Sequence, residues 1–143
     1  MTAVRVTTDR FGDLDVAADR VLSFPDGLPG FAESHGFVLV DVKDNETFFW
    51  LQSTEDPALA FLCAIPWPFF PEYAPLVPDD DQEALELTTA EDAMVLTILT
   101  VHREQSLITA NLLGPVVVNQ RTRVGRQVVL FSDDYPVQAP LVA

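Results

Sequence analysis

The sequence contains little of what most catalytic and metal-binding sites are built from, with one cysteine, two histidines and six glycines in 143 residues. One cysteine excludes an internal disulfide and a paired-thiol metal site, so Cys63, within an apolar run, is expected to be a buried, inert thiol. Neither His35 nor His102 accompanies a G-x-S-x-G serine, so a hydrolase triad is not indicated. Gly27 and Gly30 lie in a proline-containing turn, and no phosphate-binding glycine loop is present.

Basic residues are also scarce: 8 Lys and Arg stand against 22 Asp and Glu, and the net charge is −14. Such a surface repels phosphate backbones, so direct nucleic-acid binding is not expected, whereas it attracts basic proteins and speeds their association. The charge is concentrated between residues 41 and 100, where thirteen acids accompany one base, Lys43. An acidity that serves solubility alone remains an alternative.

Long hydrophobic runs are missing too. No stretch approaches the roughly 18 unbroken apolar residues that a membrane helix needs, and residues 1–9 carry no apolar signal core. The sequence is therefore interpreted as that of a cytoplasmic protein. Its 48% hydrophobic content and ten phenylalanines favour one aromatic-rich core, and we expect a single domain over residues 1–143.

What is present is a succession of short apolar or alternating runs separated by Pro, Gly and Asp. This pattern predicts an all-β, mainly antiparallel fold, a single β-barrel or roll of about nine short strands. Nearly continuous apolarity in 47–53 and 58–65 predicts strands buried on both faces. The runs interpreted as strands are 4–7, 13–16, 20–24, 37–42, 47–53, 58–65, 93–101, 107–113, 116–119 and 127–130.

Turn residues punctuate these runs. A hairpin is predicted near 9–12, a compact double turn at 25–30, and a hairpin turn at 103–106. Val124 and Gly125 are expected to turn the chain into the strand 127–130. The tail 133–143, with two prolines, is expected to be loose.

The middle of the chain departs from the strand pattern. Residues 66–78 carry five prolines, which exclude a helix and a central strand and predict an extended connector. One short helix is predicted at 79–87, with Asp79 as its cap and acidic residues in its first turn. The carboxylates of this turn could attract a hard cation, but adjacent helix residues point in different directions, which favours a solvated helix start over a metal site.

Exposed carboxylates beside proline-fixed aromatics provide anchors and a charged rim, the two components of a protein-binding surface. The alternative is that these aromatics simply close one end of the barrel. No catalytic residue, metal ligand or cofactor is predicted. The candidate partner-binding residues are Glu55, Asp56, Trp67, Phe69, Phe70, Tyr73, Asp79, Asp80, Asp81 and Glu83.

Several segments in order resemble the FliW family of flagellar assembly factors. They are Phe24–Phe31 (FPDGLPGF), Trp50–Phe61 (WLQSTEDPALAF), Thr109–Asn119 (TANLLGPVVVN) with its extension Gly125–Leu130, and Pro66 with Phe70–Tyr73. The resemblance covers nearly the whole chain. The departures are Trp67-Pro68 in place of a less bulky pattern, Gly114 where the family has Ala, and a short tail without charge at its end.

The resemblance implies a β-barrel-like protein without catalysis, whose family members bind CsrA, a small basic translational repressor, and relieve its repression. It also implies binding of flagellin, which displaces CsrA and so couples flagellin synthesis to secretion. We expect the acidic surface to hold CsrA, with Glu55, Asp56 and the 79–83 acids as leading contacts.

The residues alone are also compatible with two other functions. A hydrolase or lyase acting through paired carboxylates would show two close acids in a polar cleft. A small-ligand-binding β-barrel would show an empty apolar cavity behind the phenylalanines.

Overall fold

The computed structural model describes residues 3–141, which form two β-sheets, one α-helix and three single-turn 3-10 helices. The strands and α1 are β1 (Ala3–Thr8), β2 (Gly12–Ala17), β3 (Leu22–Ser23), β4 (Gly36–Asp41), β5 (Phe48–Ser53), β6 (Ala60–Ala64), α1 (Asp79–Ala84), β7 (Ala93–His102), β8 (Leu107–Ala110), β9 (Val116–Asn119), β10 (Val124–Gln127) and β11 (Ala139–Pro140). The 3-10 helices are η1 (Ala18–Arg20), η2 (Ala90–Asp92) and η3 (Arg103–Gln105).

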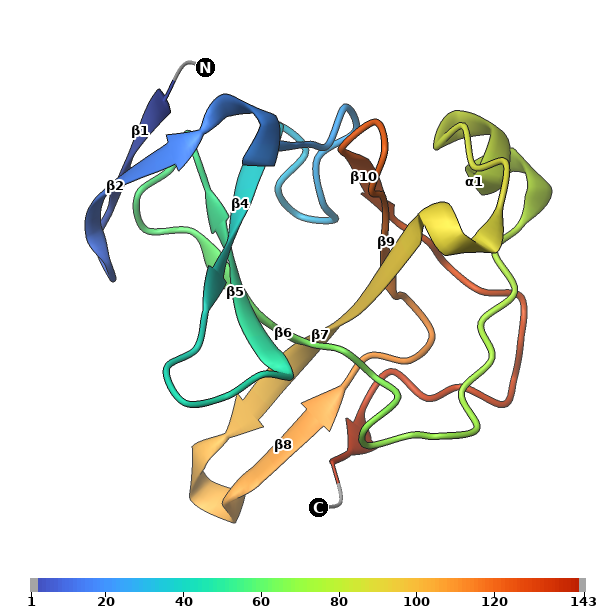
Figure 1. Ribbon diagram of the computed structural model, residues 1–143. Coiled ribbons are helices and arrows are strands. Elements are labelled where there is room, and N and C mark those ends of the chain that lie inside the picture. Colours follow the sequence, from blue (N-terminus) through green and yellow to red (C-terminus); the bar gives the residue numbers. More distant parts are fainter. Residues whose placement is uncertain (1–2, 142–143) are drawn as a thin grey trace.

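The larger sheet closes on itself through β7. The order of its strands is β11-β8-β7-β6-β5-β4-β3-β10-β9, and β7 additionally pairs with β9. The seven strands β7, β6, β5, β4, β3, β10 and β9 therefore form a ring, which β8 and β11 extend on one side (Figure 1). All of its pairings are antiparallel except the single contact of β10 with β3, where Val124 faces Ser23. The predicted all-β, mainly antiparallel, roll-like fold is confirmed.

One strand makes this closure possible. The first half of β7, Ala93–Leu96, pairs with β9, and its last part, Leu99–His102, pairs with β8 in a hairpin that leaves the ring. Between these, Thr97 and Ile98 pair with β6. Since successive residues point to opposite faces of a strand, β7 contributes to two different cores.

The core inside the ring is built on phenylalanine and leucine. Phe24 and Phe37 pack edge to face with ring centroids 5.2 Å apart, and both side chains are fully buried. Leu96 of β7 and Val118 of β9 belong to the same cluster. Cys63 also lies here, and burial raises the pKa of its thiol to about 12, as expected for an inert cysteine.

The second core lies on the outer face of β7 and β9. Val95 and Leu99 of β7 and Val117 of β9 point into it, alternating with neighbours that face the ring interior. The irregular segments 66–90 and 128–141 cover this face, with Tyr73, Leu85 and Leu130 among the side chains they bury. Full two-sided burial therefore falls on β9 and the centre of β7, whereas β5 and β6, expected to be buried throughout, are half buried along their first three residues.

The hairpin predicted near 9–12 is confirmed as β1–β2, and it forms a separate two-stranded sheet. Thr8 and Gly12 close its turn, and the turn lies on the outside of β5. There the Arg10 guanidinium stacks 4.2 Å from the centroid of Trp50, and the Phe11 ring lies 6.3 Å away from the same side chain. The hairpin thus shields an indole that would otherwise be exposed.

Three local predictions are wrong in their boundaries. The helix ends at Ala84 rather than 87, because Glu86 adopts a positive φ of 53°, and Pro78 rather than Asp79 occupies the cap position. The turn predicted at Val124-Gly125 lies at 120–123, where Arg123 has φ 64°. Those two residues instead belong to β10, because Gly125 gives the Phe24 ring space on the inner face of the strand.

The segment after Asp133, expected to be loose, is docked on the body as far as it is described. Ala139 and Pro140 form β11 and pair with β8, and Ala139 is buried. Tyr135 packs edge to face on Tyr73 at 4.9 Å. Backbone hydrogen bonds and an aromatic contact therefore outweigh the prolines, and residues 142–143 of the predicted tail lie outside the described residues.

No helix within residues 3–141 has the length and apolar character required to span a bilayer.

We predict that Gly125→Ala destabilises the fold by about 2 kcal/mol, because a methyl group there meets the Phe24 ring and the Val118 side chain at 2.9 Å. Urea unfolding measures this. Val129→Ala, at a position 61% exposed, is the control and should change the free energy of unfolding by less than about 0.5 kcal/mol. Equal stabilities of the two variants would contradict this account of the packing.

Candidate functional site

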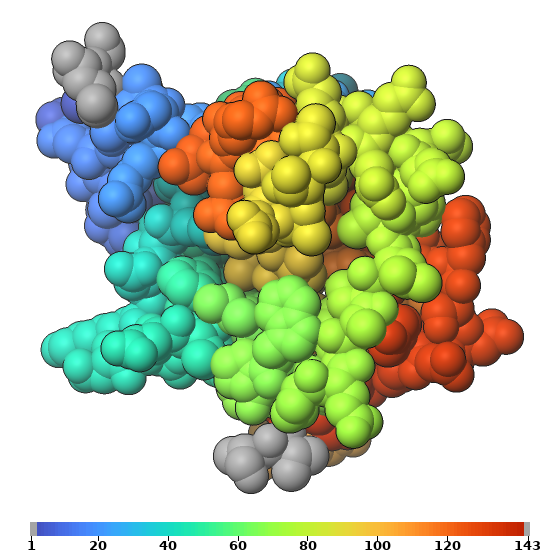
Figure 2. Space-filling model, turned by 45° about the vertical axis from the view of Figure 1, so that its right-hand side comes forward, coloured from blue at the N-terminus to red at the C-terminus, as the bar shows by residue number. Residues whose placement is uncertain are grey.

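The candidate site is the face formed by residues 72–92, which we call the acidic segment. It contains eight carboxylates and no basic residue: Glu72, Asp79, Asp80, Asp81, Glu83, Glu86, Glu91 and Asp92. The segment runs from the proline-rich connector through α1 and into β7. Figure 2 shows it as the green to yellow surface that covers much of one face of the molecule.

Two of the eight carboxylates are tied to arginines of the β9–β10 region. Asp81 Oδ1 lies 3.3 Å from Arg126 Nε, an ion-pair contact without hydrogen-bond geometry, and the Asp81 side chain is only 18% exposed. Arg126 also lies 3.6 Å from Asp26 in the turn after β3. Asp92 contacts Arg121 at 3.9 Å. Asp81, a predicted partner contact, therefore fastens α1 to β10.

The remaining six carboxylates are exposed, and no ion pair joins them to a basic side chain in residues 3–141. They are Glu72, Asp79, Asp80, Glu83, Glu86 and Glu91. Exposed like charges this close together raise the local negative potential, which is felt over about a Debye length of 8–10 Å.

The acidic segment is held in place by Asn119 at the end of β9. Its buried amide Nδ2 donates hydrogen bonds to the carbonyls of Leu85 and Glu86, at 2.8 and 3.2 Å, just after the helix. Its Oδ1 accepts from the backbone N–H groups of Arg121 and Thr122.

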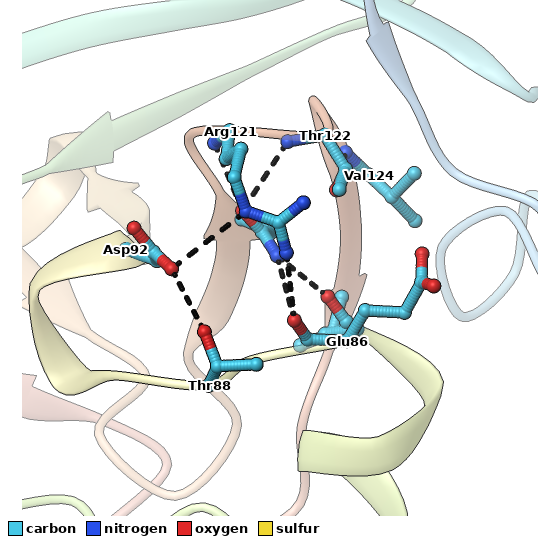
Figure 3. A network of polar contacts seen from close by, with 8 residues as sticks. Glu86, Thr88, Asp92, Arg121, Thr122 and Val124 are labelled. Carbon is cyan, nitrogen blue, oxygen red and sulfur yellow. Dashed lines mark hydrogen bonds and ion pairs between the residues drawn. The ribbon is translucent and has the colours of Figure 1, made fainter.

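Arginine 121 reinforces this attachment. Its guanidinium donates to the Glu86 carbonyl at 3.2 Å while contacting Asp92, whose carboxylate also accepts from Thr88 Oγ1 (Figure 3). Arg121, in the turn between β9 and β10, therefore helps to fasten the acidic segment to the body.

The structure does not bring Glu55 and Asp56 to this face. They lie in the turn between β5 and β6, on the other side of the ring from α1 (Figure 1). Glu55 Oε1 accepts hydrogen bonds from the backbone N–H groups of His35 and Gly36, at 2.7 and 3.1 Å. Asp56 accepts from Ala58 N–H within its own turn. The structure therefore separates these two acids from the 79–83 cluster, and both also stabilise the turns around them. Their role as partner contacts stays a prediction.

The four candidate aromatics divide between surface and core. Tyr73 is buried, and its hydroxyl donates to the Leu112 carbonyl at 2.6 Å, while burial and the neighbouring Tyr135 raise its pKa. Phe69 and Phe70 are half-buried against the outer core. Trp67 is 40% exposed, and its indole N–H donates to the Tyr73 carbonyl. The alternative that the aromatics close one end of the body therefore holds for Tyr73, and Trp67 alone of the four is an exposed side chain.

A surface pocket of about 490 Å³ lies in the acidic segment itself. One wall is the connector from Tyr73 to Val77, the opposite wall is the stretch from Leu87 to Ala90, and the floor is Ala93 and Val95 of β7. Trp67 and Gln82 complete the lining. We call this pocket the connector groove; its walls come from two parts of the acidic segment that the outer face of β7 brings together (Figure 2).

A second, more open hollow of about 570 Å³ lies behind Tyr73, lined by Phe69, Phe70, Tyr135, Glu72 and Asp134 among others. Its two carboxylates are the only acids among the linings of these two hollows within the described part of the chain. Neither hollow lies inside the ring. The interior of the ring, where a small-ligand-binding protein would have its cavity, is filled by the Phe24 and Phe37 cluster.

Within residues 3–141, no three His, Cys, Asp or Glu side chains lie close enough together to hold a metal ion. Asp79 and Asp80 are exposed and Asp81 faces Arg126, so the acids of the first helical turn diverge.

The sequence patterns did not predict two exposed apolar side chains, Leu76 and Phe131. Leu76, in the wall of the connector groove, is 84% exposed, and Phe131 is 92% exposed. Leu76 could have been noticed because it lies between Pro75 and Pro78, where no strand or helix can turn it inward. Phe131 follows Val129 by two residues along an extended stretch whose alternate members, Val128 and Leu130, are buried.

The ring of strands, its filled interior and this acidic outer face define a small roll-like β-protein with a charged surface. A family model described as "FliW protein" matches residues 5–141. The chain belongs to the FliW family.

Relatives at substantial identity come from several bacterial groups. The chain is 41% identical over 136 residues to a flagellar assembly factor FliW of Bdellovibrio bacteriovorus, covering 95% of this chain and 78% of that protein. It is 37% identical over 138 residues to one from Desulfitobacterium hafniense, covering 96% and 91%. A crystal structure of the flagellar assembly factor FliW superimposes with a TM-score of 0.89 at 34% identity, covering 98% of both chains.

We predict that Asn119→Ala destabilises the protein by about 2 kcal/mol, because it leaves the N–H groups of Arg121 and Thr122 and the carbonyls of Leu85 and Glu86 without their partner. Urea unfolding monitored by fluorescence measures the change. Gln120→Ala, at the exposed next position, is the control and should be neutral within about 0.5 kcal/mol. A neutral Asn119→Ala would mean that the acidic segment is held by its apolar contacts alone.

Proposed function

We propose that this protein is a flagellar assembly factor that acts by binding other proteins, without catalysis, in the cytoplasm. In this proposal it binds the basic translational repressor CsrA and antagonises it, and it binds flagellin, which displaces CsrA. Flagellin synthesis is thereby coupled to secretion. The observation that carries the proposal is the acidic segment, which presents six exposed carboxylates without basic partners on the described structure.

Electrostatics favour a cationic partner for this face. Complementary charge raises the association rate above the 10⁵–10⁶ M⁻¹s⁻¹ typical of neutral surfaces and rejects anionic competitors such as RNA. The chain as a whole carries a net charge of −14, so the electrostatic potential at longer range also attracts cationic proteins. In this proposal, the repressor held at such a face no longer represses translation.

One observation favours each of the two alternative functions, a hydrolase or lyase with paired carboxylates and a small-ligand-binding protein. Glu72 and Asp134 line one open hollow, as paired carboxylates of a hydrolase would, but the same hollow is walled by aromatic side chains and is shallow. The connector groove has the volume of a small-ligand pocket, about 300–1,000 Å³, and is mostly apolar. The connector groove lies on the face that we assign to protein partners, whereas the open hollow borders that face through Glu72 and Tyr73.

We predict that the triple reversal Asp79→Lys, Asp80→Lys and Glu83→Lys lowers the association rate constant for CsrA about tenfold at low salt, because it replaces attraction with repulsion. Asp81 is left intact because it holds Arg126. Stopped-flow or surface-plasmon kinetics at several salt concentrations measure the rate, and the difference should shrink as salt increases.

The matched control reverses three exposed acids elsewhere, Asp13, Asp19 and Glu104, in the β1–β2 sheet, η1 and η3. Its net charge equals that of the triple variant, so a long-range effect alone slows both alike. If the α1 acids contact CsrA directly, association is slower only for the triple variant in α1, which we call the helix variant. An association rate and salt dependence unchanged in the helix variant would eliminate α1 as the contact surface.

A further inference from the structure

The connector groove combines an apolar interior with a charged border, and neither the strands nor the core explains why it stays open. Leu76 is 84% exposed and Trp67 is 40% exposed, although both carry large apolar surfaces. Prolines on either side of Leu76 hold its backbone extended, so the side chain has no access to the core. Leaving such side chains in water forgoes their burial, which a bound partner would restore.

Hydrogen bonds hold both walls of the groove to the body of the protein. Trp67 is anchored by its hydrogen bond to the Tyr73 carbonyl, 2.8 Å long, and Tyr73 by its hydroxyl bond to Leu112. The opposite wall follows Leu85 and Glu86, which Asn119 holds. A preformed site of this kind loses little conformational entropy when it is occupied.

Charge complementarity identifies the occupant. Glu72 precedes the connector wall and Asp79 and Asp80 follow it. Glu86 and Glu91 flank the opposite wall, and all five carboxylates are exposed. The groove lining itself contains no charged side chain, only Gln82, Thr88 and Thr89 as polar members. An apolar bed with an anionic border fits one large apolar side chain flanked by cationic ones.

We propose that the connector groove is a docking site for a segment of a cationic protein that inserts a large apolar side chain between Leu76 and Ala90 and places flanking Lys or Arg side chains against the border acids. The inference rests on the proposed function, because it assigns the anchor of the cationic partner to this face. It goes beyond that function by separating two roles: the border acids set the association rate, and the groove sets the lifetime of the complex.

Two substitutions test the groove without touching the core. Leu76→Asn removes the exposed apolar wall, and Ala90→Trp fills the space from an exposed position in η2. With CsrA as the cationic probe, both variants should raise the dissociation rate constant about tenfold and leave the association rate within about twofold. Thermal unfolding of each variant should match that of the wild type.

The matched control is Val101→Asn, which removes an exposed apolar side chain, 49% exposed, from the other end of β7. Six to eight residues of strand place it roughly 20 to 26 Å along β7 from Val95 and Ala93 of the groove floor. Its dissociation rate should equal that of the wild type.

The outcomes separate the two proposals. If reversing the α1 acids slows association while both groove variants dissociate like the wild type, the groove proposal is overturned and the proposed function stands. If the wild type binds neither CsrA nor flagellin, the proposed function fails and the docking assignment fails with it. A small apolar compound released from the denatured wild type, and missing from Ala90→Trp, would assign the groove to a small ligand and overturn docking.

Discussion

The whole architecture depends on one strand, β7, whose centre is buried on both faces. β7 closes the ring by pairing with β9, continues into the hairpin with β8, and alternates its side chains between the phenylalanine core and the outer core. Because the outer face of β7 and β9 is apolar, it must be covered, and the irregular segments 66–90 and 128–141 provide that cover. The acidic segment and the connector groove are therefore consequences of covering this face.

The attachment of the acidic segment to the outer face of β7 and β9 also determines which of its carboxylates are exposed. The backbone of the acidic segment is fixed by buried contacts and by Asn119, so its carboxylates are held outward although they repel one another. Arg121 and Arg126 neutralise two of them at the base of the segment. The arginines thus stabilise the attachment of the segment and leave its outer surface anionic, which is the condition that steering of a cationic partner requires.

Sequence patterns predicted most strands, the β1–β2 and β7–β8 hairpins, the double turn at 25–30 and the all-β class, because these depend on local alternation and turn chemistry. These patterns gave wrong predictions where contacts with residues distant in the sequence determine the local structure. The stretch from Val124 is a strand because β9 pairs with it and Gly125 admits the Phe24 ring. Ala139 is docked because β8 offers an unpaired edge, which local composition does not reveal.

The sequence by itself determined the fold class, the family, and the excess of acid over base, since these follow from the order and kinds of residues along the chain. Only the tertiary structure decided which acids face outward. It paired Asp81 with Arg126 and Glu55 with the backbone of His35 and Gly36, and it buried Tyr73 in the core. It also formed a groove between two stretches of the chain, 73–77 and 87–90. The physical reason is that side-chain pairing and exposure depend on neighbours in space, which the strand order of a closed sheet brings together from distant parts of the chain.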